Sequence, residues 1–343
     1  MLKEILKITE LGIVPDRFVR YGIRQLCKKR LHEIKRDDLE SLMSQSKELI
    51  YQSSHTVIAK ETDKANAQHY ELPTDFFKLV LGENLKYSCS LYPDKKSSLS
   101  GAESSTLELY VKRAQLKDGQ SILDLGCGWG SMTLFIANKF PSSKITAVSN
   151  SKSQKDYIDA EAKLRKLDNI QVITCDINNL TFAEKFDRII SVEMLEHVSN
   201  HQILFEKIAS WTKPEGLIFI HIFCHLLAAY PFIINDESDW MAKNFFTGGI
   251  MPAYNQFLYY QNSLLIKNNW MLNGTHYENT ANAWLINLDK NKEEIALIFK
   301  KTYGNDHKKW LQRWRIFFMA CAELFGYNNG TEWVVGHYLF APR

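Results

Sequence analysis

Residues 121–131 read SILDLGCGWGS, and this stretch decides the fold of the chain. The residues up to Leu125 suit a buried strand, and the three glycines that follow are spaced as G-x-G-x-G. Glycine allows the sharp turn from a parallel strand into a helix, and it lets the backbone lie close to a ligand. The stretch therefore predicts the first strand of an α/β sheet with a nucleotide-bearing cofactor bound at its carboxyl end.

The glycine turn differs from the G-x-G-x-x-G turn of dinucleotide sites. Asp124 precedes the first glycine by two residues and can accept a hydrogen bond within the loop or from the ammonium group of a cofactor. A strand-to-helix turn without a ligand is the alternative, but strands and helices alternate on both sides of this turn. The residues expected to bind the cofactor here are Asp124, Gly126, Gly128 and Gly130.

Outward from this turn, apolar runs alternate with amphipathic segments, which is typical of a doubly wound α/β sheet. We expect strands at residues 121–125, 144–148, 170–175, 186–192, 217–222 and 332–340. We expect helices at residues 131–139, 154–167 and 201–210, and a helical region at about 281–325. The domains expected are residues 1–100, a helical cap and cofactor-covering segment, and residues 101–343, with an aromatic-rich substrate-pocket insertion at about 226–325.

The composition is that of an ordinary globular protein of 343 residues, with 45% hydrophobic and 24% charged residues. A net charge of +3 does not favour a nucleic-acid partner. The six cysteines show no C-x-x-C spacing, and residues 1–30 lack the apolar core of a signal peptide. We therefore expect a cytoplasmic protein, and a homodimer is compatible with the sequence.

Residues 216–234 contain no charged side chain and are long enough to be considered as a membrane span. They follow a predicted turn at residues 213–216, begin with β-branched and aromatic residues, and contain two histidines and a proline. A buried parallel strand that runs into a loop of the site accounts for this pattern better. The sequence therefore predicts no stable membrane insertion.

The strand after the glycine turn lacks the acidic residue that usually binds ribose hydroxyls at its end. Ser149, Asn150 and Ser151 stand there instead, followed by Gln154, so neutral groups would bind the ribose. Asp176 ends the third strand, where it could either hold an adenine amino group or cap a loop.

The fourth strand ends in the sequence SVEMLEH, residues 191–197. Two carboxylates and an imidazole are thereby expected beside the cofactor turn, where burial is costly unless the groups have partners or a task. Glu193, Glu196 and His197 are the catalytic candidates. A metal site that uses Glu196 and His197 with Cys224 and His225 is the rival interpretation, but no ligand spacing fixes such a site, and we expect no metal.

Several long motifs occur in order along nearly the whole chain: HYELPTDFF (69–77), YSCSLY (87–92), LDLGCGWGS (123–131), SVEMLEHV (191–198), IFIHIFCH (218–225), FFTGGIMP (245–252) and FGYNNGTEW (325–333). Together they resemble the coclaurine and pavine N-methyltransferase branch of the cyclopropane fatty acid synthase superfamily. The resemblance implies a class I methyltransferase (Rossmann-like) sheet, S-adenosylmethionine as methyl donor, and a Glu/Glu/His group beside the acceptor amine.

With that resemblance, the expected function is methyl transfer to the nitrogen of a small, aromatic or alkaloid-like amine, assisted by Glu193, Glu196 and His197. Further residues expected to bind the cofactor are Tyr87, Ser88, Asn150, Gln154, Asp176 and Ile177. Residues expected to contact the substrate are His221, Phe245, Tyr254, Phe257, Tyr327 and Trp333.

A cyclopropane synthase acting on lipid acyl chains is the alternative. Such enzymes usually have Gly or Ala where this chain has Glu193, and they hold a bicarbonate base with a cysteine, a histidine, a glutamate and a tyrosine. Cys89, His221 and Glu196 match three of these positions, whereas Phe317 stands at the fourth. The long amino-terminal lipid-binding part of the bacterial enzymes is not matched, so an N-methyltransferase fits better.

Overall fold

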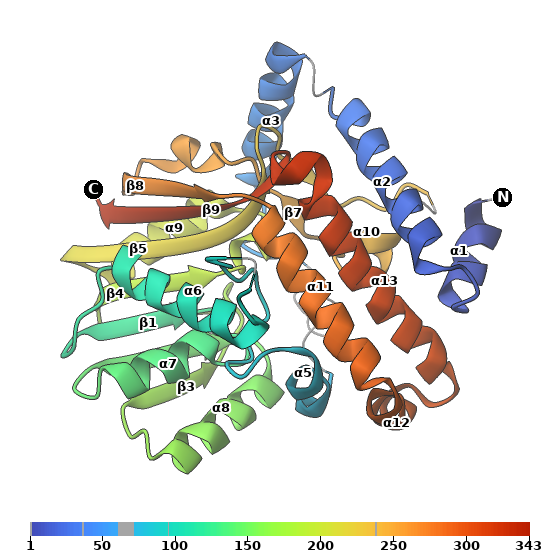
Figure 1. Ribbon diagram of the computed structural model, residues 1–343. Coiled ribbons are helices and arrows are strands. Elements are labelled where there is room, and N and C mark those ends of the chain that lie inside the picture. Colours follow the sequence, from blue (N-terminus) through green and yellow to red (C-terminus); the bar gives the residue numbers. More distant parts are fainter. Residues whose placement is uncertain (1, 36–37, 61–71, 95, 237–238) are drawn as a thin grey trace.

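A seven-stranded sheet organises the protein. The computed structural model describes residues 2–343 apart from 36–37, 61–71, 95 and 237–238 (Figure 1). The strand order is β3-β2-β1-β4-β5-β9-β8. The strands are β1 (Ser121–Leu125), β2 (Lys144–Ser149), β3 (Ile170–Thr174), β4 (Phe186–Val192), β5 (Thr212–His225), β8 (Leu264–Leu272) and β9 (Trp333–Pro342), and β6 (Tyr230–Pro231) pairs with β7 (Ile250–Met251) separately. The first five strands are parallel, and β9 and β8 are antiparallel to their neighbours.

Helices cover both faces of the sheet, because alternate strand residues point to opposite sides. On one face, apolar residues of α6 (Leu99–Arg113) and α7 (Ser131–Lys139) pack against Ile122 and Ile190. On the other face, α9 (His201–Trp211) packs against Leu123 and Ile189. The helix α8 (Lys152–Arg165) packs near β2 and β3. The expected doubly wound α/β sheet is thus confirmed.

A second helical layer lies at the carboxyl ends of the parallel strands (Figure 1). Its helices are α1 (Leu2–Glu10), α2 (Asp16–Glu33), α3 (Leu39–Ser53), α5 (Thr74–Val80), α11 (Thr275–Lys290), α12 (Lys292–Tyr303) and α13 (His307–Phe325). Buried residues of these helices and of the insertion form one apolar cluster. Because ligand sites of parallel sheets lie at this end of the strands, the layer covers the place where a site is expected.

Two expectations need correction. The predicted turn at 213–216 belongs to β5, whose pairing with β4 shifts register between Phe186 and Arg188. The predicted insertion 226–325 is interrupted by β8, which is a strand of the main sheet. The region before β8 contains only short elements, including the helix α10 (Trp240–Asn244) and a 3-10 turn at Gln256–Tyr260. The sequence of β8, LLIKNNWML, does not alternate apolar and polar residues, so it gives no strand signal.

In the parts of the chain that the structure describes, no helix has the length and apolar character needed to cross a membrane. The candidate segment 216–234 is mostly strand β5 and the loop that follows it. The first three residues of the HYELPTDFF motif lie outside the described residues.

Candidate active site at the carboxyl end of the sheet

The glycine turn after β1 is built in a way that only glycine permits. Gly126, Gly128 and Gly130 have φ angles of +84°, +52° and +77°, in the left-handed region. A Cβ atom on Gly126 would lie 2.7 Å from the side chain of Met194. A Cβ atom on Gly128 would meet no protein atom within 4 Å, although Gly128 lines a cavity. The turn therefore leaves open space beside the backbone, as a cofactor cradle requires.

The cavity beside this turn has the polar groups that a nucleoside needs. Its lining includes the predicted cofactor residues Tyr87, Ser88, Asp124, Gly126, Gly128, Asn150, Gln154 and Ile177. The Gln154 side chain is buried, its Oε1 accepts a hydrogen bond of 2.6 Å from Ser149, and its Nε2 has no partner among the described residues. A buried amide donor without a partner is costly, so this group fits a ligand that supplies an acceptor.

Two predicted cofactor residues lie behind the cavity rather than on it. Gly130 is outside the lining, and a Cβ atom there would lie 2.6 Å from Ile158, so this glycine allows the turn to pack on α8. Asp176 is also outside the lining and accepts a 2.7 Å hydrogen bond from the backbone N–H of Asn178, the loop cap that the sequence left open as an alternative. Cys175 and Ile177 line the cavity in its place.

Asp124 is buried at the base of the cavity. Its Oδ2 accepts a 2.6 Å hydrogen bond from the Thr133 hydroxyl. Burial raises the pKa of Asp124 to about 6, and the bond from Thr133 opposes this shift. The carboxylate would be stabilised further by a cationic ligand group, as expected for the ammonium of the cofactor.

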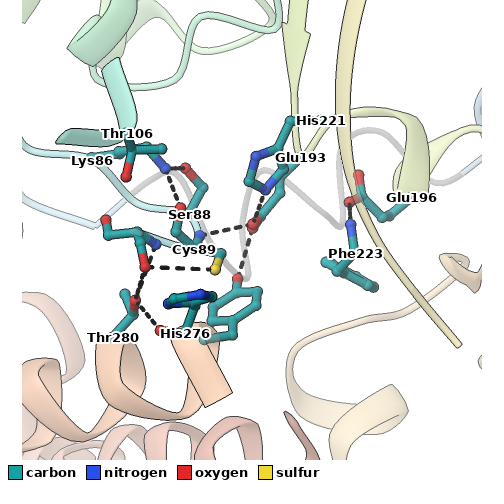
Figure 2. Close-up of polar contacts among 12 residues, drawn as sticks. Lys86, Ser88, Cys89, Thr106, Glu193, Glu196, His221, Phe223, His276 and Thr280 are labelled. Carbon is teal, nitrogen blue, oxygen red and sulfur yellow. Dashed lines mark hydrogen bonds and ion pairs between the residues drawn. The ribbon is translucent and has the colours of Figure 1, made fainter. Parts of the chain in front are cut away.

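Glu193 lies at the centre of the polar cluster (Figure 2). Its φ of +48° is unusual for a residue with a side chain and turns the carboxylate away from the direction of β4. Glu193 Oε1 accepts a 2.8 Å hydrogen bond from the Cys89 backbone N–H and lies 3.0 Å from His221 Nε2. Glu193 Oε2 accepts a 2.7 Å bond from the Tyr277 hydroxyl. Four distant segments therefore meet at one carboxylate.

The charge balance of Glu193 involves a lysine that the sequence analysis missed. Burial raises the pKa of Glu193, while Lys86 and the Cys89 and Tyr277 hydrogen bonds oppose this shift. Lys86 lines the cavity and is buried, and its ammonium donates to the Ser88 hydroxyl at 2.6 Å and to the Cys89 carbonyl. Nothing in the local sequence marks Lys86 or Tyr277, since each acts through a contact with a distant segment.

Glu196 and His197 leave the same strand end in different directions. Glu196 Oε1 accepts a 2.7 Å hydrogen bond from the Phe223 backbone N–H, so this carboxyl binds β5. Burial and the charge of Glu193 raise the pKa of Glu196 well above its usual range. The His197 ring lines the cavity and stacks on Phe246 at 5.8 Å between centroids, and burial lowers its pKa to about 4. His197 is therefore a neutral acceptor at pH 7.

The predicted substrate residues lie mostly in the packed core. Phe245, Phe257 and Trp333 are buried, and none of them lines the cavity. Phe245 stacks on Phe317 at 4.4 Å, which accounts for its burial without a ligand. Tyr254, Tyr327 and His221 also lie outside the lining. Of this set, only His221 contacts a catalytic candidate.

The lining of the cavity includes Thr247, Gly248 and Gly249, which lie in the loop between α10 and β7. It includes no described residue of α11, α13 or β9. Cavity-facing Lys60 and Ala59 approach the same space from the amino-terminal part. Among the described residues, no group of three or more His, Cys, Asp or Glu side chains is arranged to hold a metal ion. The cavity is thus bounded by a glycine turn on one side and a carboxylate–imidazole cluster on the other.

Comparison with known proteins identifies the family. The model of the mycolic acid cyclopropane synthetase family matches residues 58–332. The chain is 40% identical to a (S)-coclaurine N-methyltransferase of Papaver somniferum over 99% of this chain and 98% of that protein. It is 34% identical to a pavine N-methyltransferase of Thalictrum flavum subsp. glaucum over 99% of this chain and 96% of that protein.

A solved structure is also closely similar. The crystal structure of a coclaurine N-methyltransferase bound to N-methylheliamine and SAH superimposes with a TM-score of 0.96, covering 98% of this chain and 99% of that chain at 38% identity. The match confirms the class I methyltransferase fold, and the cofactor cradle described above agrees with S-adenosylmethionine as the donor. The chain therefore belongs to the mycolic acid cyclopropane synthetase family, and within it this protein is an S-adenosylmethionine-dependent N-methyltransferase.

Proposed function

We propose that the protein methylates the nitrogen of an aromatic, alkaloid-like amine and that Glu193 binds and deprotonates this amine. The observation that carries the proposal is the Glu193 carboxylate, which lines the cavity and is held by three protein donors. A carboxylate has about four acceptor sites, so one site on Oε2 remains for an amine N–H. The names of the relatives, coclaurine and pavine N-methyltransferases, support an alkaloid substrate.

Protonation of the amine is the main obstacle to its methylation. An alkylamine with a pKa near 10.4 is neutral in about one of several thousand molecules at pH 7, a handicap of roughly 4–5 kcal/mol. Because burial raises the pKa of Glu193, its carboxylate is a stronger base than an exposed one. The neutral His197 ring can accept a hydrogen bond from the same amine. This bond would keep the lone pair of the amine nitrogen aligned with the methyl group that is transferred.

The remaining residues bind and align. S-adenosylmethionine, when bound, supplies a methyl group on a positively charged sulfur. We propose that Asp124 and the glycine turn hold the amino-acid end of this donor and that Asn150 and Gln154 hold its ribose. Phe246 stacks on His197 and supports its ring beside the cavity, although Phe246 itself is outside the cavity lining. Phe246 was not among the substrate residues expected from the sequence.

The domain arrangement expected from the sequence supports a covering role for residues 1–100. Ala59, Lys60, Lys86, Tyr87 and Ser88 all line the cavity, although the glycine turn lies in the α/β domain. We propose that this segment encloses donor and amine together, which excludes water from the reacting atoms.

Cyclopropane formation on a lipid is the second candidate, and one observation argues against it. Cys89 and His221 match positions at which cyclopropane synthases hold bicarbonate, but here both contact the carboxylate of Glu193. The Glu193 side chain therefore lies between Cys89 and His221, and in this proposal its carboxylate takes the place of the bicarbonate base.

The test is methylation by Glu193→Gln and His197→Ala, measured with labelled S-adenosylmethionine, amines of the coclaurine type, and phospholipids. We expect label in the amines only, with rates reduced roughly 10²- to 10⁴-fold by Glu193→Gln and at least tenfold by His197→Ala. Higher pH should restore part of the Glu193→Gln rate, because the solvent then supplies neutral amine.

Cofactor affinity, measured by calorimetry, should be unchanged in both variants. A Glu193→Gln enzyme as fast as the parent at pH 7 would remove Glu193 from the chemistry, and label in lipid would favour the second candidate. The cytoplasmic location and the homodimer stay predictions, for which fractionation and sedimentation velocity are the measurements.

A further inference from the structure

A chain of three hydrogen bonds connects Glu193 to a half-buried arginine at the end of α6. Arg113 Nη1, at the end of α6, lies 2.5 Å from His337 Nδ1 on β9. His337 Nε2 lies 2.9 Å from His221 Nδ1 on β5. His221 Nε2 lies 3.0 Å from Glu193 Oε1. Both histidines are completely buried, and they pair side by side across β5 and β9.

The donors and acceptors along this chain can be assigned from Arg113 alone. A guanidinium has only N–H donors and keeps its proton in proteins, so His337 Nδ1 must accept. The proton of neutral His337 is then on Nε2, which donates to His221 Nδ1. The proton of neutral His221 is consequently on Nε2, where it points at the carboxylate of Glu193.

Two further observations agree with this assignment. The Tyr110 hydroxyl also lies 2.7 Å from His221 Nδ1 and can donate to it, which is compatible with a nitrogen that carries no proton. Burial, with the positive charges of Lys86 and Arg113, lowers the pKa of His221 and of His337 well below the usual value, and both rings are therefore neutral. In the opposite tautomer, the lone pair of His221 Nε2 would face the carboxylate.

We propose that Arg113 is a positioning residue that acts through His337 to fix the tautomer of His221, so that His221 donates a hydrogen bond to Glu193 and holds it as the charged base. Arg113 is not catalytic, because two histidines separate it from the carboxylate. The inference rests on the proposed role of Glu193. It assigns a function to His221 and His337 on the sheet and to Arg113 on α6, none of which lines the cavity.

The hydrogen-bonded chain Arg113–His337–His221 is called the relay below. Other titratable groups also face Glu193, and they influence its pKa independently of the relay. They are Lys86 and Cys89 in the loop before α6, Tyr110 on α6, Glu196 and His197 after β4, Tyr277 on α11, and Cys321 on α13. Tyr110 also contacts His221, but its hydroxyl can donate or accept, so it does not by itself fix the tautomer of His221. Lys86 is the strongest of those that favour the charged carboxylate.

The first experiment reads the tautomers directly. In the ¹⁵N-histidine-labelled enzyme, the nitrogen shifts of His221 and His337 distinguish protonated Nε2 from protonated Nδ1. We expect both rings to be neutral with the proton on Nε2 between pH 6 and 9. In Arg113→Met, His337 should lose its fixed tautomer, whereas Arg113→Lys, which keeps a permanent donor, should retain it.

The second experiment is the pH profile of kcat/KM for the same variants. Loss of the donor to a carboxylate destabilises its charged form, so the acidic limb should shift upward by about one pH unit in Arg113→Met. Arg113→Lys should restore the parent profile. Arg188→Met is the matched control, because Arg188 is also half-buried but donates only to the carbonyls of Asp187, Ala114 and Gln115.

A purely structural role for Arg113 predicts that Arg113→Met and Arg188→Met lower the melting temperature and leave the acidic limb in place. That result, or a proton on Nδ1 of His221 in the parent enzyme, overturns the proposal. The proposed function fails separately: if Glu193→Gln retains full activity, Glu193 is not the base, while the tautomers read by ¹⁵N shifts are unaffected by that outcome.

Discussion

The buried carboxyl group of Glu196 makes the free energy of unfolding depend on pH. Its side chain is completely buried, and its Oε2 has no partner among the described residues. Burial raises the pKa of Glu196 in the folded protein well above its usual value of 4.5, so the folded state retains a proton that the unfolded state releases. The free energy of unfolding must therefore fall as pH rises above about 4.5.

We predict that Glu196→Gln is more stable than the parent at pH 8 and gains less at pH 5, because glutamine cannot be charged. Scanning calorimetry at several pH values measures this difference. Glu193→Gln provides the comparison at the neighbouring carboxyl, whose charge is partly balanced by Lys86. A melting-temperature difference that does not depend on pH would mean that Glu196 is charged in the folded enzyme.

Single residues were predictable where chemistry is concentrated in one segment. SVEMLEH placed two carboxylates and a histidine together, and the structure puts all three at the end of β4. Tyr277, Lys86 and Phe246 were missed, because each is an ordinary residue in its own segment and matters only through a contact across the fold. Core aromatics such as Phe245 were mistaken for pocket residues, since burial against protein and burial against ligand look alike in sequence.

Among the elements, the turn between β1 and α7 allows a sharp test of the cofactor cradle. Gly128 has a positive φ and no protein atom near its virtual Cβ, and the same is true of Gly119 in the turn before β1. We predict that Gly128→Ala weakens S-adenosylmethionine binding at least tenfold. Both substitutions should cost similar stability, about 1–2 kcal/mol, because the backbone strain is alike.

Calorimetric titration and thermal unfolding of Gly128→Ala and Gly119→Ala measure these two effects. Equal cofactor affinity in the two variants would place the donor away from the turn. Gly119 is the control because it is outside the cavity lining. A methyl group there adds the same backbone strain as at Gly128 but takes no space from the ligand.

The elements differ in how far sequence determines them. Strands β1 and β4 and helix α7 were predicted with the bounds observed, because each is a buried run next to a strong turn signal. Strand β8 was missed, since its pattern contains exposed residues on both sides and it forms the edge of the sheet. Strand β5 was underestimated at both ends, because Pro214 and Glu215 near its start resemble a turn locally, whereas the pairing with β4 is tertiary.

In the whole molecule, the amino-terminal helices are attached to the carboxyl-terminal ones by ion pairs. Glu323 on α13 is 5% exposed and accepts hydrogen bonds from Arg20, at 2.8 Å, and Arg24, both on α2. Arg20 also donates to Asn282 on α11 at 2.8 Å. Removing the carboxylate would deprive the largely covered Arg20 of its ion pair, whereas Arg24 is 60% exposed and loses less.

We predict that Glu323→Gln increases deuterium uptake in α2 and lowers stability by about 1.5–3 kcal/mol, while β1 to β5 stay protected. Glu33→Gln is the control, because its pairs with Lys29 and Arg30 are exposed and contribute little. Unchanged exchange in α2 of Glu323→Gln would mean that apolar packing alone holds the amino-terminal layer.

The position of β9 has a consequence for folding. This strand lies inside the sheet, where it bridges β5 and β8. Its pairing with β5 joins segments that are far apart in the sequence, and such contacts form slowly because a long stretch of chain must first close into a loop. Until that pairing forms, two strand edges are left exposed. Because β9 also contributes His337, the enzyme acquires the last contact of its relay only when the sheet has closed.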